Sequence, residues 1–221
     1  MRTKILNIFV FFFIFVNSNL KAESIIFDTK NIKIENDGDM IFATNGIAKI
    51  PLKNLKIEGD KFVYDRKTLE LIIFDNVRYV DLENDIIIES QKMIYDELEN
   101  KVFSQSKTYL EVENNYEIKS SNVLFDRKLK KISSKDYTEV EDKIKNKFIF
   151  NQGLIFDTFD QIVSSKKILI KDQNLNKYFF ENTKINLKLN EIAGKEIKVD
   201  FEDSFFGNEN NDPTLKGSSI I

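Results

Sequence analysis

One stretch recurs through this chain of 221 residues, and its clearest copy is Gly59-Asp60-Lys61-Phe62-Val63-Tyr64-Asp65-Arg66. The second copy is Ser90-Gln91-Lys92-Met93-Ile94-Tyr95-Asp96-Glu97, and the third is Ser121-Asn122-Val123-Leu124-Phe125-Asp126-Arg127. Each copy has an aspartate as its next-to-last residue, and these aspartates, at 65, 96 and 126, stand 31 and then 30 residues apart. A unit of this length cannot bury its apolar face alone, so the repeat predicts a stack of similar units.

Looser copies extend the series in both directions. Ile34-Glu35 precedes the first copy, Phe156-Asp157 follows the third, and Val199-Asp200 is a candidate for the last. The register after Asp157 stays open, because Ile170 also matches the pattern. The repeat therefore covers most of the chain.

Apolar and polar residues alternate within each unit, which is the period of a β-strand with one buried face. Clusters of Asn, Asp and Gly lie between the alternating runs and suit tight turns. Short turns favour antiparallel pairing, because parallel crossovers need a dozen residues or more. The fold class predicted is all-β: an antiparallel β-jellyroll or folded, elongated sheet built from repeated strand pairs. The charged segment Ser133 to Lys147 is compatible with a helical turn or two, or with a loop or hairpin.

The composition excludes several functional classes. The chain contains no cysteine and no histidine, which removes thiolate nucleophiles, imidazole bases and the usual zinc ligands. We therefore expect no enzyme and no cofactor or metal site. Lys and Arg number 33 against 36 Asp and Glu, without a basic block, so a nucleic-acid partner is not indicated.

The sequence suggests three segments. Arg2 and Lys4 precede an apolar run from Ile5 to Val16, which is the layout of a signal peptide over residues 1–22. Residues 23–202 carry the repeat and are expected to form one domain. Residues 203–221 are polar and turn-rich, and read as a linker to a C-terminal region that this sequence lacks.

These residues resemble the OstA-like domain of the lipopolysaccharide transport (Lpt) family. The resemblance rests on Ala43-Thr44-Asn45-Gly46-Ile47-Ala48, on Gly59-Asp60 with Tyr64-Asp65, and on Phe74-Asp75-Asn76-Val77-Arg78, and it covers roughly residues 25–201. The later repeats lose the Gly-Asn-Val-like step of the family.

Three members of the family are similar: a soluble periplasmic bridge, an inner-membrane-anchored protein, and the N-terminal domain of the outer-membrane assembly protein. The segment Asn211 to Ser219 resembles the connection between that N-terminal domain and its barrel. The resemblance thus implies a truncated member of the third kind, in the periplasm and associated with the outer membrane through the missing barrel.

The resemblance implies a transport function without chemistry. Its expected partners are lipopolysaccharide, whose acyl chains an apolar groove would shield, and other bridge proteins, which would pair through edge strands. Alternation places apolar residues on the inward faces, where aromatic rings offer a large contact area. The candidate lining residues are Phe62, Tyr64, Leu71, Ile73, Val77, Tyr79, Ile88, Met93, Tyr95, Val123 and Phe125.

Other interpretations of the same residues remain open. Any β-sandwich core alternates in the same way, so an exported structural β-repeat protein with a solid core, such as an adhesin or fibre module, is the alternative function. Asp65, Asp96 and Asp126 lack the spacing of a calcium loop and are predicted to cap turns at strand ends. The acidic run Glu139-Val140-Glu141-Asp142 is predicted to be a solvated face and not a catalytic carboxylate pair.

Overall fold

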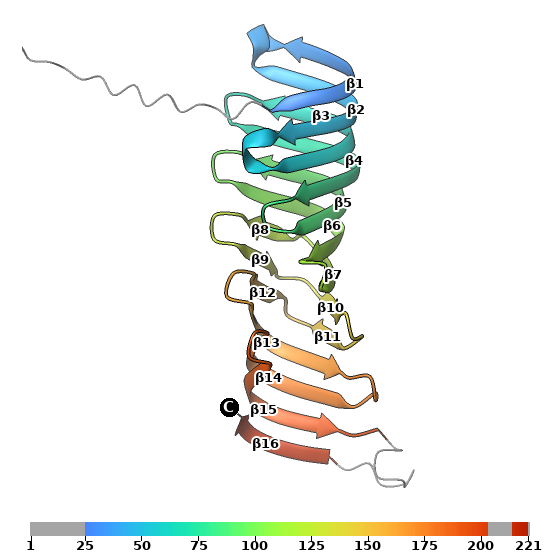
Figure 1. Cartoon of the computed structure of the whole chain (residues 1–221), viewed down its shortest axis with the longest axis vertical. Coiled ribbons are helices and arrows are strands. Elements are labelled where there is room, and N and C mark those ends of the chain that lie inside the picture. The colour runs from blue at the N-terminus through green and yellow to red at the C-terminus, as the bar shows by residue number, and fades with distance from the viewer. Residues whose placement is uncertain (1–24, 203–213, 221) are drawn as a thin grey trace, which may run out of the picture.

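The computed structural model describes residues 25–202 and 214–220, which form one long antiparallel β-sheet (Figure 1). The expected signal peptide and linker residues 203–213 lie outside the described residues. The strands are β1 (Ile26–Glu35), β2 (Met40–Ile50), β3 (Leu55–Asp65), β4 (Glu70–Asp81), β5 (Ile86–Asp96), β6 (Lys101–Val112), β7 (Tyr116–Ser121), β8 (Leu124–Asp126), β9 (Lys131–Ser134), β10 (Thr138–Asp142), β11 (Lys147–Phe150), β12 (Leu154–Asp157), β13 (Ile162–Lys171), β14 (Lys177–Asn186), β15 (Glu191–Asp200) and β16 (Thr214–Ile220). Two short 3-10 turns, η1 (Asn36–Gly38) and η2 (Pro51–Lys53), separate the first three strands. The predicted all-β antiparallel class is confirmed.

The repeat corresponds to two strands and two turns. Asp65, Asp96 and Asp126 end β3, β5 and β8, and each accepts a hydrogen bond from a backbone N–H two or three residues ahead: Lys67 at 2.8 Å, Glu99 at 2.7 Å and Leu129 at 2.9 Å. A short carboxylate side chain that satisfies turn N–H groups explains why aspartate recurs there. The prediction that these residues cap turns is confirmed.

The last copy of the repeat is not Val199-Asp200. Asn186 ends β14 and takes the equivalent place, because its Oδ1 accepts hydrogen bonds from the N–H groups of Lys188 and Leu189, both at 3.1 Å. Asp200 ends β15, which runs in the opposite direction and closes at the other side of the sheet. Asparagine has the same reach as aspartate, so its side-chain oxygen caps the turn in the same way.

The long strands bend near their middles. Irregular pairing interrupts the ladders between Glu58 and Lys61, between Phe74 and Val77, and between Ser90 and Lys92. Bulges at neighbouring positions in successive strands fold a sheet over on itself, because each one bends its strand. Gly46 lies at the corresponding place in β2, where a Cβ atom would overlap the Asp28 carbonyl and Thr29 of the adjacent strand.

In the middle of the molecule the bend becomes a break. β6 pairs with β8 through Lys101–Phe103 and with β7 through Lys107–Val112. The chain closes a hydrogen-bonded ring through β6, β7, β10, β11, β13, β12, β9 and β8. Within this ring, the segment from Ser133 to Lys147 contains β10 and the flanking parts of β9 and β11. β10 and β11 pair as a hairpin around the turn 143–146, so the hairpin interpretation is confirmed and the segment is not helical.

The turns form two rows, one at each end of the strands, and contacts of Arg127 with Lys53 and Glu83 bring the two rows together near the centre of the body. The first turn row consists of residues 36–39, 66–69, 97–100, 127–130, 158–161 and 187–190. The second turn row consists of residues 51–54, 82–85, 113–115, 143–146 and 172–176. Backbone hydrogen bonds run along the first row, for example from the Arg127 N–H to the Asn100 carbonyl at 3.2 Å. We call the line between the two rows the seam.

The C-terminal residues 214–220, which the sequence placed in a linker, form β16 and pair with β15 along Thr214↔Asp200 to Ile220↔Gly194. Apolar and polar residues do not alternate clearly in this segment, because Lys216, Gly217 and Ser218 interrupt the pattern. The sheet thus continues beyond residue 202 in the structure.

Candidate functional site

The residues predicted to line the interior do face inward. Each is between 0% and 6% exposed, and all belong to one continuous apolar cluster that extends from β2 to β15. The cluster also contains many residues that were not among the predicted lining residues, including Phe150, Phe156 and Phe180. Whether any of them contacts lipid stays a prediction.

The interior is tightly packed in this structure. The apolar gap between the folded halves has a volume of only about 20 Å³. It lies in the C-terminal part of the body, between the two sides of the ring and β14. Its walls carry no exposed polar surface and consist of Tyr116, Ile118, Val140, Phe148, Phe150, Leu154, Phe156, Val163, Ile185 and Leu187. A linear alkyl chain therefore needs the two halves to separate before it can enter.

At the β1 end of the body, the apolar interior reaches the surface. Ile32 and Ile34 pair with buried Ala43 and Ile41, so they point inward, yet they are 50% and 58% exposed. Directly paired residues share a face of the sheet, and no further strand covers these two in the described part of the chain. Phe27, on the same inward face, packs edge-on against Phe62 with ring centroids 6.1 Å apart.

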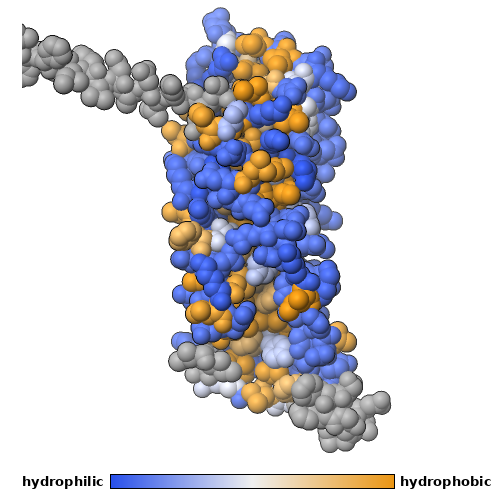
Figure 2. Space-filling view, viewed as in Figure 1, coloured by the Kyte–Doolittle hydropathy of each residue, from blue (hydrophilic) through white to orange (hydrophobic). Residues whose placement is uncertain are grey.

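The β16 end repeats this arrangement. Leu215 pairs with buried Val199 and so lies on the inward face, and it is 53% exposed. Figure 2 shows hydrophobic side chains at the β1 end and along the body between hydrophilic flanks. The apolar column therefore ends in uncovered side chains at both ends.

Both terminal strands also leave one backbone edge unpaired among the described residues. β1 pairs with β2 alone, and β16 pairs with β15 alone. Such edges carry free N–H and C=O groups that accept a strand from another chain. Apolar side chains and open backbone edges thus coincide at each end.

A buried polar cluster crosses the seam near the centre of the body. The Arg127 guanidinium donates to both Asp81 oxygens, at 2.6 and 3.2 Å, and the two side chains are 3% and 0% exposed. It also donates to the Asn100 side chain at 3.1 Å and to the Lys53 carbonyl at 3.2 Å. Burial, the largest single influence, would lower the pKa of Arg127, but the hydrogen bond to Asp81 together with electrostatic interactions with Tyr79, Asp81 and Tyr95 raises it. Arg127 is therefore held as a cation.

Two tyrosines extend this polar edge of the interior. The Tyr64 hydroxyl donates to Glu97 at 2.8 Å, and burial, followed by this hydrogen bond, raises the pKa of Tyr64. The Lys53 ammonium donates to the Tyr95 hydroxyl at 2.9 Å. The rings of both tyrosines lie in the apolar cluster, so their hydroxyl groups mark its polar boundary at the seam.

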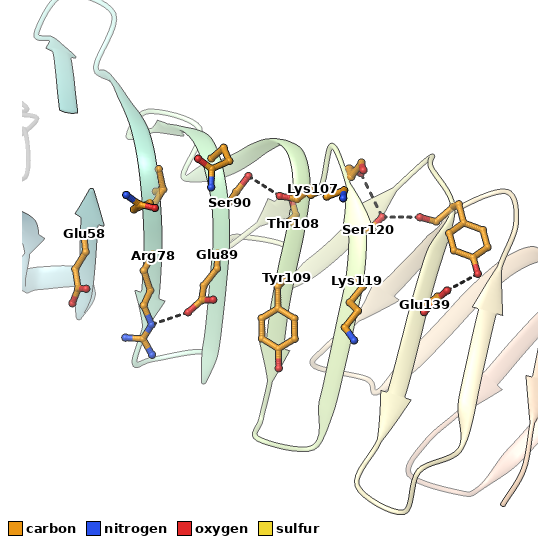
Figure 3. A pocket seen from close by; sticks show the side chains of 15 residues that line it. Glu58, Arg78, Glu89, Ser90, Lys107, Thr108, Tyr109, Lys119, Ser120 and Glu139 are labelled. Carbon is orange, nitrogen blue, oxygen red and sulfur yellow. Dashed lines mark hydrogen bonds and ion pairs between the residues drawn. The ribbon is translucent and has the colours of Figure 1, made fainter. Parts of the chain in front are cut away.

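The outer face carries a broad groove of about 850 Å³ on the opposite side of the sheet from the apolar interior (Figure 3). Six side chains in cross-strand register form a ladder along it: Glu58, Arg78, Glu89, Tyr109, Lys119 and Glu139. Acidic and basic side chains follow one another along much of the ladder, and Arg78 forms an ion pair with Glu89 at 3.1 Å. The groove therefore lies over a surface of mixed charge.

In the acidic run on β10, Glu139 and Glu141 lie on this outer surface, whereas Val140 between them faces the apolar gap. Glu139 accepts a hydrogen bond from the Tyr137 hydroxyl at 2.6 Å, and Glu141 pairs with Lys145 at 2.6 Å. In the described ranges, no cluster of three or more acidic side chains is placed to hold a metal ion. The carboxylates of Glu139 and Glu141 are thus engaged with hydroxyl and basic neighbours, and Asp142 accepts hydrogen bonds from the backbone N–H groups of Ile144 and Asn146.

The chain matches no protein-family model and no curated protein sequence. Among residues 25–202 and 214–220, no helix has the length and apolar character needed to cross a membrane.

Proposed function

We propose that this protein takes part in lipopolysaccharide transport and assembly at the outer membrane, as a bridge component that shields acyl chains. The observation that carries the proposal is the apolar column, which runs through the body and emerges uncovered at Ile32 and Ile34 on one end and at Leu215 on the other. Open backbone edges accompany both ends. A second protein of the same fold that pairs with either edge would extend both the sheet and the column.

The proposed mechanism involves burial and no chemical step. Apolar surface contributes about 25 cal/mol per Å² removed from water, so an acyl chain is held by many small, non-directional contacts along the column. Such contacts exchange easily as a chain moves along a uniform apolar surface. The proposed partners are lipopolysaccharide and other Lpt bridge proteins, in the periplasm.

The sequence resemblance gives this proposal its family. It favours the N-terminal periplasmic domain of an LptD-like assembly protein, with LptA-like and LptC-like bridges as the alternatives. Three features support membership of the Lpt family: the repeated strand pair, the single elongated sheet, and an unpaired strand edge at each end of it.

The closed interior favours a second candidate function. A gap of about 20 Å³ holds no acyl chain, and the central core residues are almost fully buried. An exported structural β-repeat module with a solid core, such as part of an adhesin or fibre, would have this packing. The two candidates differ in whether the halves ever separate.

A photo-crosslinking experiment in cells separates the candidates. Benzoylphenylalanine at Ile34 or Leu215, which are inward and exposed, and at Phe62 or Tyr95, which are inward and buried, is expected to form adducts with lipopolysaccharide. The same probe at Leu98, an outward turn position that is 59% exposed, serves as the control and is expected to form none. Folded protein without adducts at any inward position would leave the solid-core module as the function.

A further inference from the structure

Arg127 belongs to the first turn row, but its side chain also contacts the second row and the end of β4 that leads into it. Its guanidinium reaches Asp81 at the end of β4, the Glu83 carboxylate at 3.1 Å, and the Lys53 carbonyl at 3.2 Å. Its own backbone N–H remains bonded along the first row, to Asn100. One side chain therefore ties together the two edges of the folded sheet, across the seam that covers the apolar interior.

The repeat provides an internal comparison for this position. Arg66 follows Asp65 as Arg127 follows Asp126, and both arginines begin the turn after a strand. Arg66 is exposed and donates to the Gly38 carbonyl at 3.1 Å, within its own turn row. The crossing contact is thus a property of the place of Arg127 in the fold and not of the Asp-Arg pair in the sequence.

The chemistry of the contact between Arg127 and Asp81 suits a bond that holds the seam closed but can be broken. Burying two charges costs solvation free energy, which their mutual attraction only partly offsets. Apolar side chains of the same volume often stabilise a folded protein equally well or better. A forked guanidinium on a carboxylate instead gives a directional bond that holds one geometry. Glu83 is 58% exposed, so the outer edge of the cluster faces water.

The core beneath the cluster is fully buried. Tyr79 and Tyr95 are 0% exposed, and the Tyr79 hydroxyl donates to Asp81 at 3.3 Å. Separation of the two turn rows would uncover these rings together with the apolar residues between them. The polar cluster and the apolar core are thus closed by the same contacts.

We infer that Arg127 is a latch: its bonds to Asp81 and Glu83 hold the seam shut, and release of Arg127 opens the interior along the long side of the body. The use of this opening to admit an acyl chain rests on the proposed transport function. The latch itself does not, because a seam can be opened and measured without any lipid.

The test measures the width of the seam in the lipid-free protein. Because the chain contains no cysteine, Leu82→Cys and Leu129→Cys allow specific spin labelling of one exposed turn position in each row. Pulsed electron resonance then reports the distance distribution across the seam. The native pair is expected to give one narrow distribution, and Arg127→Met is expected to give a broader one with longer distances.

Two further variants complete the test. Arg66→Met removes the arginine at the equivalent repeat position and is expected to leave the native distribution unchanged. Arg127→Lys keeps the positive charge but loses the forked guanidinium, and it is expected to broaden the distance distribution. Circular dichroism shows whether each variant folds, and Arg127→Lys serves as the test if Arg127→Met does not fold. A native distribution in folded Arg127→Met or, if that variant does not fold, in Arg127→Lys overturns the latch. Failure of lipopolysaccharide crosslinking alone would count against the transport function and not against the latch.

Discussion

Strands β4–β6 and strands β13–β15 share the same alternation of apolar and polar residues, yet they bury their inward faces to different degrees. In β4–β6 the inward apolar side chains, such as Ile73 and Met93, are at most 1% exposed. In β13–β15 Val163 is 9%, Phe180 7% and Val199 8% exposed. Alternation therefore decides which side chains point inward but not how tightly the interior closes over them.

The contacts across the seam explain the difference. Over β4–β6 the charged side chain of Arg127 joins the two turn rows through several bonds at once. Further along, Gln161 in the first row donates to Glu113 in the second at 2.8 Å, which is a single amide donor. The small apolar gap lies on this side, with Tyr116, Phe148 and Leu187 half-buried around it. The C-terminal half is thus the more readily opened part of the interior.

Removal of Asp81 should have the largest effect on stability. Asp81→Ala leaves the Arg127 cation buried without its main partner, and breaking one side of a buried pair costs about 3–5 kcal/mol. Urea unfolding measures the loss in free energy of unfolding. Asp39→Ala removes an exposed partner of Lys67 and should cost no more than about 1 kcal/mol. Equal small losses in the two variants would remove the seam contact as the cause of the difference between the halves.

Matched core truncations compare the two interiors directly. Ile73→Ala, at a side chain that is 0% exposed, should cost about 3–4 kcal/mol, and Ile185→Ala, beside the apolar gap and 5% exposed, about 2 kcal/mol. The smaller cost follows because fewer contacts are lost where packing is already incomplete. Denaturation midpoints at a constant m-value give both numbers. A larger loss for Ile185 than for Ile73 would contradict the ranking of the halves.

The second turn row of the C-terminal half should respond to acid through Asp172. Burial by itself would raise the pKa of this carboxyl, but hydrogen bonds from Asn176 and Tyr178 outweigh burial and lower it below 3.8. Because the folded pKa is lowered, the contribution of Asp172 is complete above the ordinary value and declines as the pH falls through the folded pKa. Asp172→Asn should cost about 1 kcal/mol at pH 7, where the loss of hydrogen bonds is fully felt.

Urea midpoints of the wild type and Asp172→Asn, followed from pH 7 down to about pH 2, measure this linkage. The difference between the two proteins should be constant above about pH 5 and should shrink below the ordinary pKa of an aspartate. A difference that grows on acidification would show that the pKa of Asp172 is raised and not lowered in the folded protein.

The sequence predicted what depends on local pattern. Alternation around Phe62 and Tyr95 placed both side chains inward, and Asp65, Asp96 and Asp126 cap turns as their spacing and type indicate. The all-β antiparallel class follows from the same two signals. Both signals depend on only a few neighbouring residues: strand pleating determines which side chains point inward, and hydrogen bonding within the turn determines which residue caps it.

What the sequence missed depends on the bend of the whole sheet. Arg66 and Arg127 stand in the same motif, and only the folded geometry brings Arg127 opposite Asp81. The uncovered ends at Ile34 and Leu215 likewise follow from which strands are last in the sheet. No local pattern encodes these relations, since their partners lie tens of residues away.

The smallest effects are expected on the outer face, where the halves should not differ. Arg78 pairs with Glu89 across β4 and β5 at 3.1 Å, and Lys167 pairs with Glu181 across β13 and β14 at 3.0 Å. All four side chains are more than 40% exposed, so each pair should contribute no more than about 0.5–1 kcal/mol.

Double-mutant cycles to alanine, measured by urea unfolding at low and high salt, give the two coupling energies. Both should be similar and should fall with added salt, because exposed charges are screened. The Arg78 pair could instead show a coupling energy that is well above that of the Lys167 pair and insensitive to salt. That result would mean that the two halves already differ on their outer surface. Equal couplings would confine the difference between the halves to the interior and its seam.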